Sequence, residues 1–372
     1  MKIALLSCFY PYRGGIAQFN ANLFTELGLS HTVKAFNFKR QYPNFLFPGK
    51  SQFVTAEDKA VQIESVSVLD TINPISYYKT VQAINDWEPD LLIMRYWMSF
   101  FAPSQGFVGR RLLKKTKIIS ILDNVVPHER RFFDTPFTKY FLEGNHGFIV
   151  LSSAVGQDLL KLKPNANYTT IPHPLYNHFG EKVDRAFAQK QLRLEPGKKN
   201  LLFFGLIREY KGLDILIDAF SSLDQSYQLI IAGEPYGSFE TYRKKIENSP
   251  AKDRIKTFTR YISDAEVPLF FSAADITVLP YRTATQSGIS AISFHFDVPL
   301  ITTNVGGLKE AIEQPGTGIV VDKAQSDHIA NGIKQFFEEG NQEYYINNIE
   351  KEKEELSWKK FSEKLIKFYH TL

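Results

Sequence analysis

Short apolar runs alternate with longer amphipathic stretches along the first half of the chain. The runs are KIALLSC (2–8), HTVKAFNF (31–38), DLLIMRY (90–96), KIISIL (117–122), GFIVLS (147–152) and YTTIP (168–172). Runs of this length are typical of strands in a parallel sheet, and the amphipathic stretches between them are typical of crossover helices. The first half therefore predicts a doubly wound parallel α/β sheet.

The same pattern restarts in the second half, after a polar stretch at 179–199 that has no core-strand character. The second set of runs is NLLFFG (200–205), QLIIAG (228–233), DRIKTF (253–258), DITVLPY (275–281), PLITT (299–303) and GIVVD (318–322). We therefore expect two sheet domains, at 1–178 and 200–345, joined by a linker at 179–199. Residues 346–372 are predicted to be C-terminal helices, with one apolar stripe formed by Trp358, Phe361, Leu365 and Phe368.

Composition narrows the class of protein. The chain has 372 residues, which is too long for one ordinary core at about 150 residues per domain. A net charge of +4 is too small to indicate nucleic acid as a partner. Cys8 is the only cysteine, so an internal disulfide and a cysteine-based zinc cluster are excluded, as suits a reducing cytoplasm.

Membrane contact is expected to be peripheral at most. The opening residues indicate a first strand rather than a secretory leader. No apolar run approaches the roughly 18 to 20 residues that a spanning helix needs. The basic cluster GRRLLKKTK (109–117) fits either contact with an anionic membrane surface or a solvated helix face.

Two open α/β sheets predict a cleft between the domains, with ligands bound at the carboxyl ends of the strands. The most informative strand exit is GLIREYKGLD (205–214), where Arg208 and Lys211 lie three residues apart. Side chains at that spacing face one side of a helical turn and can converge on a diphosphate. Two solvated cations are the alternative, but their place at a strand exit favours the anion site.

Other strand exits carry weaker signals. Gly14 and Gly15 open a helix after the first strand, where amides can approach a phosphate or simply form a tight turn. Another helix begins at Ser287, Gly288 and Ile289. These residues can bind an anion at the helix start, or Ser287 can cap the helix, and both can be true. Glu234 follows a strand and can accept hydrogen bonds from hydroxyls. Asp123, His128 and Glu129 cluster after a strand of the first domain.

Several reaction classes are disfavoured by what the sequence lacks. There is no H-E-x-x-H motif, no paired-histidine metal spacing and no G-x-S-x-G elbow. A metalloenzyme or a serine hydrolase is therefore not expected.

Four segments together give the chain a family resemblance. They are GGIAQFNANL (14–23), GLIREYKGLDILIDAF (205–220), LIIAGE (229–234) and SAADITVLPYRTATQSGISAISFHFDVPLITTNVGGLKE (272–310). Their order and spacing resemble the family-4 retaining glycosyltransferases of the GT-B fold. The resemblance implies two Rossmann-like domains, a nucleotide-sugar donor bound mainly by the second, an acceptor held by the first, and a last helix that returns to the first domain. It implies no cofactor and no catalytic metal.

The resemblance also assigns roles by position. Arg208 and Lys211 match the basic pair that holds the donor diphosphate. Gly15, beside Gly14, matches the first-domain loop that approaches the phosphates, and Asp123 stands where many members carry a histidine near the sugar. The helix start that receives the distal phosphate is matched by Ser287, Gly288 and Ile289. The strand exit that meets the nucleobase is matched by Tyr261 and Ile262.

The chain also departs from the family pattern. Many members have two glutamates, separated by seven residues, that bind the sugar and the ribose. Those places fall on Ala284 and Ile292, which accept no hydrogen bonds from hydroxyls. Thr285, Gln286 or Glu234 are the candidates to replace them, and the ATQSG form resembles a branch of the family.

The resemblance implies transfer of a sugar, with retention, from a nucleotide-diphosphate sugar to a saccharide or lipid-linked saccharide, in the synthesis of a surface polysaccharide or glycoconjugate at the cytoplasmic face of the membrane. Arg208 and Lys211 would stabilise the leaving diphosphate, whereas Asp123 keeps a double-displacement route open. His128 and Glu129 are placed on the acceptor side.

The acceptor and the reaction class are the most open points. Aromatic segments at 40–53 and 95–107 suit sugar stacking or lipid contact, and ordinary packing explains them equally well. A nucleotide-sugar epimerase of the same fold is one alternative function. The absent glutamates motivate a second, a non-catalytic nucleotide-sugar-binding or scaffold protein.

Overall fold

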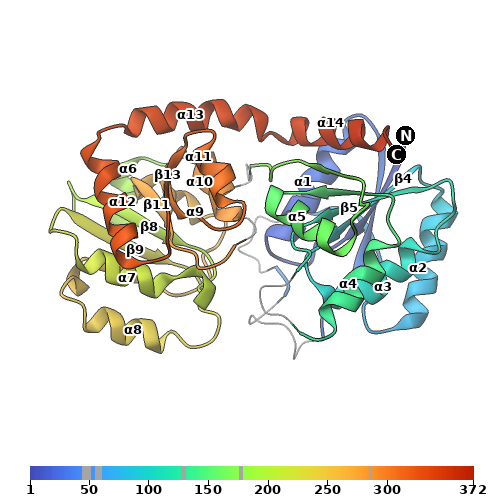
Figure 1. Ribbon diagram of the computed structural model, residues 1–372, viewed down its shortest axis with the longest axis horizontal. Coiled ribbons are helices and arrows are strands. Elements are labelled where there is room, and N and C mark those ends of the chain that lie inside the picture. Colours follow the sequence, from blue (N-terminus) through green and yellow to red (C-terminus); the bar gives the residue numbers. More distant parts are fainter. Residues whose placement is uncertain (44–51, 55–60, 127–130, 176–178, 285–286) are drawn as a thin grey trace. The chain divides into compact units, whose positions relative to one another are not determined.

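The chain folds into two compact units, shown in a computed structural model in Figure 1. The structure describes residues 1–43, 52–54, 61–126, 131–175, 179–284 and 287–372. The first unit contains the described residues from Met1 to Pro174 together with Ser357–Leu372, and the second contains those of Leu175–Leu356.

Within the described residues, the first unit is built on a seven-stranded parallel sheet of order β3-β2-β1-β4-β5-β6-β7. Its strands are β1 Lys2–Ser7, β2 Thr32–Arg40, β3 Ser65–Asp70, β4 Leu91–Tyr96, β5 Lys117–Leu122, β6 Gly147–Val150 and β7 Tyr168–Thr170. Its helices are α1 Gly15–Gly28, α2 Pro74–Trp87, α3 Ala102–Gly109, α4 Asp134–Leu142, α5 Ser153–Leu162 and α14 Trp358–Tyr369, with a 3-10 turn, Ser99–Phe101, before α3.

Alternating side chains of β1 show how this sheet buries both faces. Ala4 and Leu6 enter one core, which α2, α3, α4 and α5 cover. Ile3 and Leu5 enter the opposite core, which α1 and α14 cover. Burial on both faces explains why the strands are continuous apolar runs.

The second unit has the same layered plan around a six-stranded parallel sheet of order β10-β9-β8-β11-β12-β13 in the part of the chain that the structure describes. Its strands are β8 Lys199–Phe204, β9 Tyr227–Ala232, β10 Ile255–Phe258, β11 Ile276–Leu279, β12 Leu300–Thr303 and β13 Gly318–Val321. Its helices are α6 Arg185–Gln191, α7 Leu213–Ser221, α8 Glu240–Glu247, α9 Val267–Ala273, α10 Gly288–His295, α11 Leu308–Glu313, α12 Ser326–Glu338 and α13 Gln342–Glu355, with 3-10 turns at Glu209–Lys211 and Lys252–Arg254.

The strand order has one consequence for function. In the second unit the chain runs outward from β8 to β10 and then continues with β11 on the other side of β8. In the first unit it runs outward from β1 to β3 and continues with β4 on the other side of β1. The order therefore reverses between β8 and β11 and between β1 and β4, and the strand exits at such reversals diverge and leave room for a ligand.

The predicted fold class, two doubly wound parallel sheets, is confirmed. Every predicted apolar run forms a strand, but β3 was missed. Its sequence, SVSVLD, alternates serine with valine, and the strand lies at the sheet edge, where Val66 and Ser67 are exposed. An apolar-run criterion selects strands buried on both faces and so passes over such an edge strand.

The stretch expected as a linker, 179–199, belongs to the second unit. Asp184 caps α6 by accepting a hydrogen bond from the Phe187 amide at 2.7 Å. Ala188, Leu192 and Leu194 are buried against the core that contains α9. Three apolar side chains among many polar ones were too few to predict this packing.

Helix α13 also packs in the second unit, since Ile349 and Tyr345 enter its two cores. The return to the first unit therefore begins at Ser357, later than the expected residue 346. The hydroxyl of Ser357 caps α14 through the Lys360 amide at 3.3 Å. The predicted stripe of α14 is buried against Phe19 of α1, whose ring centroid lies 4.8 Å from that of Trp358 and 5.5 Å from that of Phe361.

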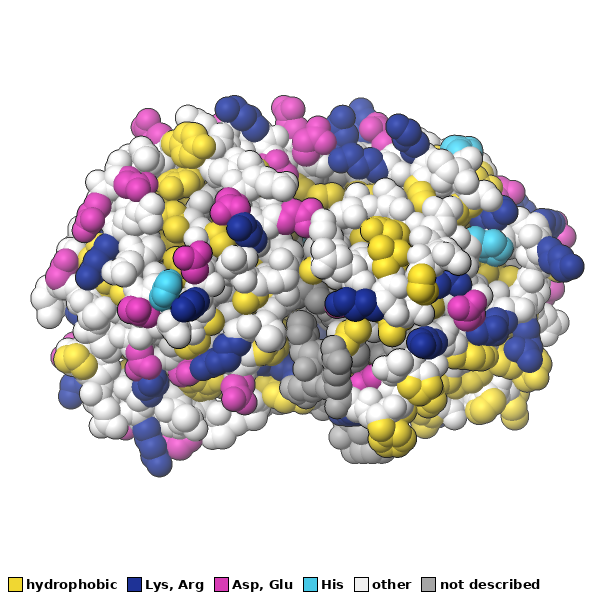
Figure 2. Space-filling model, viewed as in Figure 1, with side chains coloured by type: hydrophobic (Ala, Val, Ile, Leu, Met, Phe, Trp, Pro, Cys, Tyr) yellow, Lys and Arg dark blue, Asp and Glu magenta, His cyan; other side chains and the backbone are white. Residues whose placement is uncertain are grey.

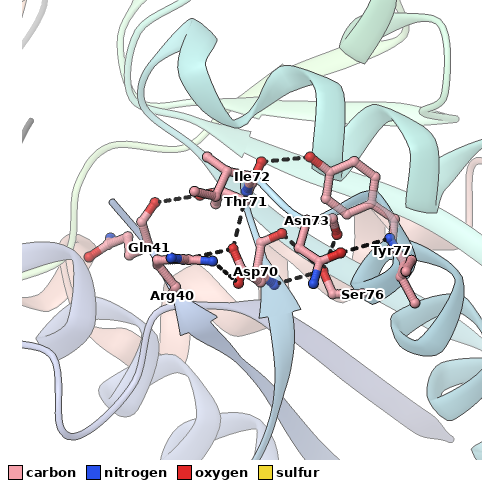
Figure 3. Close-up of polar contacts among 9 residues, drawn as sticks. Arg40, Gln41, Asp70, Thr71, Ile72, Asn73, Ser76 and Tyr77 are labelled. Atoms are coloured by element: carbon pink, nitrogen blue, oxygen red, sulfur yellow. Dashed lines mark hydrogen bonds and ion pairs between the residues drawn. The ribbon is translucent and has the colours of Figure 1, made fainter. Parts of the chain in front are cut away.

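A polar network fixes the start of α2 at the edge of the first sheet (Figure 3). The guanidinium of Arg40 donates two hydrogen bonds to the carboxylate of Asp70, at 3.0 and 2.5 Å. Burial alone would raise the pKa of the Asp70 carboxyl, but the hydrogen bond from Arg40 helps to hold it below its usual range. The Ser76 hydroxyl donates to the Asp70 carbonyl at 2.9 Å, and the Tyr77 hydroxyl donates to the Thr71 carbonyl at 2.6 Å. Ser76 and Tyr77 thus bind α2 to the end of β3.

Among the described residues, no helix has the length and apolar character that crossing a bilayer would require.

The docking of α14 predicts the effect of truncating its stripe. Leu365→Ala should lower the free energy of unfolding of the first unit by about 2–5 kcal/mol, because Leu365 is fully buried and its removal leaves a cavity. Urea unfolding measures this value. Lys367→Ala, at an exposed position of the same helix, is the control and should change it by less than about 0.5 kcal/mol. Equal effects of the two substitutions would contradict the packing described for α14.

Candidate functional site

Three segments of the second unit meet where β8 and β11 end. They are the loop that follows β8, the 3-10 turn Glu209–Lys211 and the start of α10. Gly205 has a positive φ of 99°, and a Cβ atom there would lie 3.0 Å from Cδ1 of Ile289 and 3.4 Å from Nζ of Lys211. The ammonium of Lys211 and the first turn of α10 therefore lie on either side of a glycine that leaves the space between them open.

Lys211 is the most unusual charged group of this site. Its side chain is only 8% exposed, and its Nζ lies 5.6 Å from the centroid of the Tyr281 ring. Among the described residues, no carboxylate forms an ion pair with this ammonium and no oxygen accepts a hydrogen bond from it. Burial, and to a lesser extent the nearby guanidinium of Arg208, lowers the pKa of Lys211 to about 8. A buried ammonium that lacks an ion-pair partner among the described residues favours the binding of an anion.

Arg208 precedes the 3-10 turn and adds a second cation. Its guanidinium carbon lies 4.4 Å from the centroid of Tyr236 and 5.6 Å from that of Tyr210. The loops after β8 and β9 are joined by backbone hydrogen bonds, from the Ile207 amide to the Glu234 carbonyl and from the Tyr236 amide to the Ile207 carbonyl, both at 2.9 Å. The structure thus brings the loop of Glu234 beside the basic pair.

The start of α10 faces the same space. Ser287 caps the helix, since its hydroxyl accepts a hydrogen bond from the Ile289 amide at 3.3 Å and lies 3.4 Å from the Tyr281 hydroxyl. Gly288 is the first residue of the helix. The hydroxyl of Ser290, in the first turn, is buried and has no hydrogen-bond partner among the described residues. The positive end of the helix and Lys211 therefore act on one region. Thr285 and Gln286 lie outside the described residues.

A salt bridge that sequence reasoning missed holds the basic turn in place. The guanidinium of Arg282, after β11, donates to both oxygens of Asp214 in α7, at 2.9 and 2.5 Å, and to the Glu209 carbonyl at 2.8 Å. The Arg282 amide donates to the Tyr210 carbonyl at 2.7 Å. Gly212 allows this contact, because a Cβ atom there would lie 2.0 Å from the Pro280 carbonyl oxygen. Two strand exits are thereby fastened together around Lys211.

The segment expected to meet the nucleobase follows β10, two strands from β8 in the sheet order. The Tyr261 carbonyl accepts a hydrogen bond from Arg260 at 3.0 Å, and Ile262 is buried in the core. Arg260 also binds Glu266, and this hydrogen bond lowers the pKa of the Glu266 carboxyl to about 2. The strand exit is therefore held in one conformation by a salt bridge.

The two positions where glutamates were expected by resemblance are buried apolar residues. Ala284 and Ile292 are both part of the core of the second unit. Sugar and ribose hydroxyls therefore need other acceptors.

The first unit presents a separate set of predicted residues. Gly14 caps α1 and Gly15 begins it, directly after the reversal-point strand β1. Among the described residues, no atom lies within 4 Å of the position that a Cβ atom on Gly14 would take. His128 and Glu129 lie outside the described residues.

Asp123 follows β5 and is bound by a residue that sequence reasoning missed. The guanidinium of Arg95 donates to both carboxylate oxygens of Asp123, each at 2.6 Å, and the pair is buried. The Arg95 carbon lies 3.7 Å from the centroid of Phe19. Beside the pair, burial and then Arg95 lower the pKa of His173 to about 4, so this imidazole is neutral at physiological pH. Asp123 is thus a member of a buried ion pair.

The aromatic residues at 95–107 pack against one another and against rings elsewhere in the first unit. Phe101 is fully buried and lies 4.3 Å from Trp97 between ring centroids, and the Trp97 indole donates to the Tyr42 hydroxyl at 2.9 Å. Ordinary packing, one of the two explanations that the sequence allowed, therefore accounts for these rings. Residues 44–51 of the other aromatic segment lie outside the described residues.

Comparisons with known proteins show what the chain is similar to. Residues 184–353 match the family described as glycosyl transferases group 1. An uncharacterised glycosyltransferase of Methanocaldococcus jannaschii is 28% identical over 349 residues, which is 90% of this chain and 87% of that protein. The D-inositol 3-phosphate glycosyltransferase of Pseudarthrobacter chlorophenolicus is 27% identical over 197 residues, so this match spans only 47% of each chain.

A solved structure extends the likeness of the fold to the whole chain. Anabaena HepE in complex with UDP-glucose superposes with a TM-score of 0.75 at 16% identity and covers 100% of both chains. The chain therefore has the GT-B fold, and residues 184–353 are similar to the glycosyl transferases group 1 family.

The buried ammonium predicts a stability effect with a defined sign. Lys211→Met should raise the free energy of unfolding at pH 7 by about 1–3 kcal/mol, because folding would no longer dehydrate a charged group. In the wild type the pKa falls from 10.5 to about 8 on folding, so the folded state binds fewer protons and stability rises with pH across that window. The difference in the free energy of unfolding between Lys211→Met and the wild type should therefore shrink as the pH approaches 10.5.

Urea unfolding at several pH values measures this difference. Lys244→Met, at an exposed position of α8, is the control and should show no such pH dependence. A Lys211→Met protein that is less stable than the wild type at pH 7 would contradict the absence of a partner for this ammonium.

Proposed function

We propose that the protein transfers a sugar, with retention, from a nucleotide-diphosphate sugar to a saccharide or lipid-linked saccharide acceptor. The proposed setting is the synthesis of a surface polysaccharide or glycoconjugate at the cytoplasmic face of the membrane. One observation carries the donor assignment: the buried ammonium of Lys211 lies beside Gly205 and the first turn of α10 and has no acceptor among the described residues.

A diphosphate fits this site better than a single carboxylate does. The ammonium and the amides at the start of α10 favour negative charge from two sides, and Arg208 adds a third source nearby. One ion pair at 4 Å contributes about 4 kcal/mol at an effective dielectric of about 20. Two phosphate groups can engage all three donors together. HepE, of the same fold, binds UDP-glucose, which supports a nucleoside diphosphate as the ligand.

The same groups suit the chemistry of the leaving group. When the bond between the anomeric carbon and the phosphate oxygen breaks, negative charge grows on the departing diphosphate. Lys211, Arg208 and the helix start stabilise that charge more in the transition state than in the bound donor. These cations supply the stabilisation on which a metal-independent reaction depends. Among the described residues, no three His, Cys, Asp or Glu side chains are grouped so as to hold a metal ion.

The state of Asp123 bears on which of two retaining routes the enzyme uses, because double displacement and attack from the side of the leaving group both retain the configuration. Both of its oxygens accept hydrogen bonds from Arg95, which lowers their nucleophilicity and disfavours a covalent glycosyl intermediate on this carboxylate. In the route that we propose, the acceptor hydroxyl attacks the anomeric carbon from the side of the leaving group. The new carbon–oxygen bond forms as the bond to phosphate breaks, and the hydroxyl proton passes to a phosphate oxygen.

Recognition of the sugar and the ribose is assigned to the loops around the site. Ala284 and Ile292 are buried in the core and offer no acceptor. Glu234 lies in the loop paired with the basic segment, and Thr285 and Gln286 precede the cap of α10. We propose these three side chains as the acceptors for the hydroxyls.

The donor site predicts a loss of affinity when either cation is removed. Lys211→Met and Arg208→Gln should each weaken binding of the best ligand among UDP, GDP, ADP and CDP by about 10- to 100-fold, because each loses a charge-assisted hydrogen bond to phosphate. Isothermal titration calorimetry gives the dissociation constants. Lys244→Gln is the matched control for overall charge. Unchanged affinity in both variants, or no binding of any of the four nucleotides to the wild type, would overturn the assignment.

The pKa of Lys211 predicts the pH dependence of that binding. Below about pH 8 the ammonium is charged and available, and above it a proton must be taken up when the diphosphate binds. Affinity should therefore fall by about tenfold per pH unit above pH 8. Lys211→Met should bind weakly and almost independently of pH over the same range. A wild-type affinity that stays constant from pH 7 to pH 10 would contradict the role of Lys211.

A further inference from the structure

One side of the first unit exposes apolar and basic side chains together. Figure 2 shows such side chains gathered over the region of α2, α3 and α4. We call this surface the α2–α4 face. Its exposed residues are the apolar Ile75, Tyr78, Leu113, Phe132, Phe137 and Tyr140 and the basic Arg110, Arg111, Lys114, Lys115 and Lys139. Phe132 is 95% exposed and Ile75 is 67% exposed, which is costly for side chains of this size in water.

Several of these side chains contact one another or share a neighbouring ring. The Tyr78 ring lies 4.7 Å from Phe107 between centroids, and the guanidinium carbon of Arg111 lies 3.8 Å from the centroid of Phe107. Arg110 lies 4.4 Å from the centroid of Tyr140 and donates a hydrogen bond to its carbonyl at 2.8 Å. Aromatic rings and guanidinium groups therefore alternate from α2 across α3 to α4.

The aromatic surface continues past the start of α4. Phe137 lies 5.5 Å from Phe133, and Phe133 lies 5.3 Å from Phe132, between ring centroids. The most exposed apolar side chain of the face is thus connected, through Phe133, to Phe137 of α4.

The charge of this face is positive. Residues 99–117 contain five Lys and Arg residues and no Asp or Glu. The acidic residue of α4, Asp134, is buried and accepts hydrogen bonds from the Ser99 hydroxyl and the Arg131 amide. Lys115 forms an exposed ion pair with Glu88 at 2.9 Å, and Asp86 is exposed at the end of α2. The cations on the face outnumber these carboxylates, so its field favours an anionic partner.

The local structure holds the apolar side chains outward. Ser76 and Tyr77 turn into the network at the end of β3, which Figure 3 shows, and both are buried. Their neighbours Ile75 and Tyr78 consequently project to the exposed side of α2. The exposure is a fixed feature of the fold, because the Arg40–Asp70 ion pair and the capped start of α2 hold it.

We propose that the α2–α4 face binds the surface of an anionic lipid bilayer. Apolar and aromatic side chains enter the boundary between headgroups and acyl chains, while Lys and Arg side chains meet anionic headgroups. A nucleic acid would satisfy the cations but would leave Ile75, Leu113 and Phe132 in water. A bilayer binds both kinds of side chain, because its acyl boundary takes up the apolar ones and its anionic headgroups pair with the basic ones. This inference deepens the part of the proposed function that places the enzyme at a membrane.

Sedimentation with lipid vesicles tests the proposal without any nucleotide or sugar. The full chain is mixed with vesicles of phosphatidylcholine alone or of equal parts phosphatidylcholine and phosphatidylglycerol. We expect binding to the mixed vesicles that weakens as salt is added, and much weaker binding to phosphatidylcholine alone.

Two double variants separate the contributions. Lys114→Gln/Lys115→Gln should lower partitioning onto the mixed vesicles by about 25-fold, at about fivefold per cation. Ile75→Ser/Phe132→Ser should lower it by at least about tenfold and should make the remainder more sensitive to salt. Both substitutions change exposed side chains, so folding should be preserved.

Matched controls lie on the opposite side of the same sheet. Lys359→Gln/Lys367→Gln removes two exposed cations from α14, and Leu29→Ser changes an apolar side chain that is 75% exposed at the end of α1. Both should bind vesicles as the wild type does. Losses in the controls as large as in the face variants would overturn the proposal, as would equal binding to both kinds of vesicle.

The proposal is also overturned if the wild type does not sediment with mixed vesicles, or if it binds duplex DNA at the same salt concentration and ignores vesicles. Nucleotide affinity, measured on the same face variants, should equal that of the wild type because the donor residues belong to the other unit. If the proposed donor site is wrong, only the calorimetric measurements of nucleotide affinity will show it. If the proposed membrane contact is wrong, only the sedimentation with vesicles will show it.

Discussion

The arrangement of the second unit depends on a buried cation that lacks an acceptor of its own. Taking an ammonium out of water is unfavourable, and proteins usually offset the cost with a carboxylate or a set of carbonyls. At Lys211 the fold provides neither among the described residues, and the pKa falls to about 8 as a result. Among the residues that the structure describes this ammonium has no acceptor, and the adjacent helix start favours an anion as its partner.

The rest of the unit keeps this site open and fixed. The reversal of strand order between β8 and β11 separates the two exits. Gly205 leaves the space between Lys211 and α10 free of a side chain. The salt bridge from Arg282 to Asp214 fastens the exit of β11 to the basic turn. In the proposed reaction, charge that is already in place would stabilise the leaving group without rearrangement of the site.

Much of this fold could be predicted from the sequence, because parallel strands buried on both faces are continuous apolar runs and carry a strong local signal. The edge strand β3 was missed because its serines and valines alternate, and the packing of 179–199 was missed because only a few apolar residues provide it. The proximity of Arg208 and Lys211 at a strand exit was also predictable, since the two residues are close in sequence and follow a strand.

Pairings between distant residues were not predictable in the same way. Arg282 meets Asp214, and Arg95 meets Asp123, only because strand order brings their loops together. A signal did exist for Arg95, because an arginine inside an otherwise apolar strand needs a buried acceptor. Which carboxylate satisfies it follows from tertiary structure alone. The burial of Lys211, on which the donor assignment depends, is likewise a property of the fold.

The most direct test of the account is a crystal structure of the protein with the nucleoside diphosphate that it binds most tightly. The account predicts diphosphate oxygens within hydrogen-bond distance of Nζ of Lys211 and of the backbone amides of Gly288 and Ile289, with the guanidinium of Arg208 turned toward the same group. A diphosphate bound elsewhere on the second unit, with Lys211 still buried and unpaired, would contradict it.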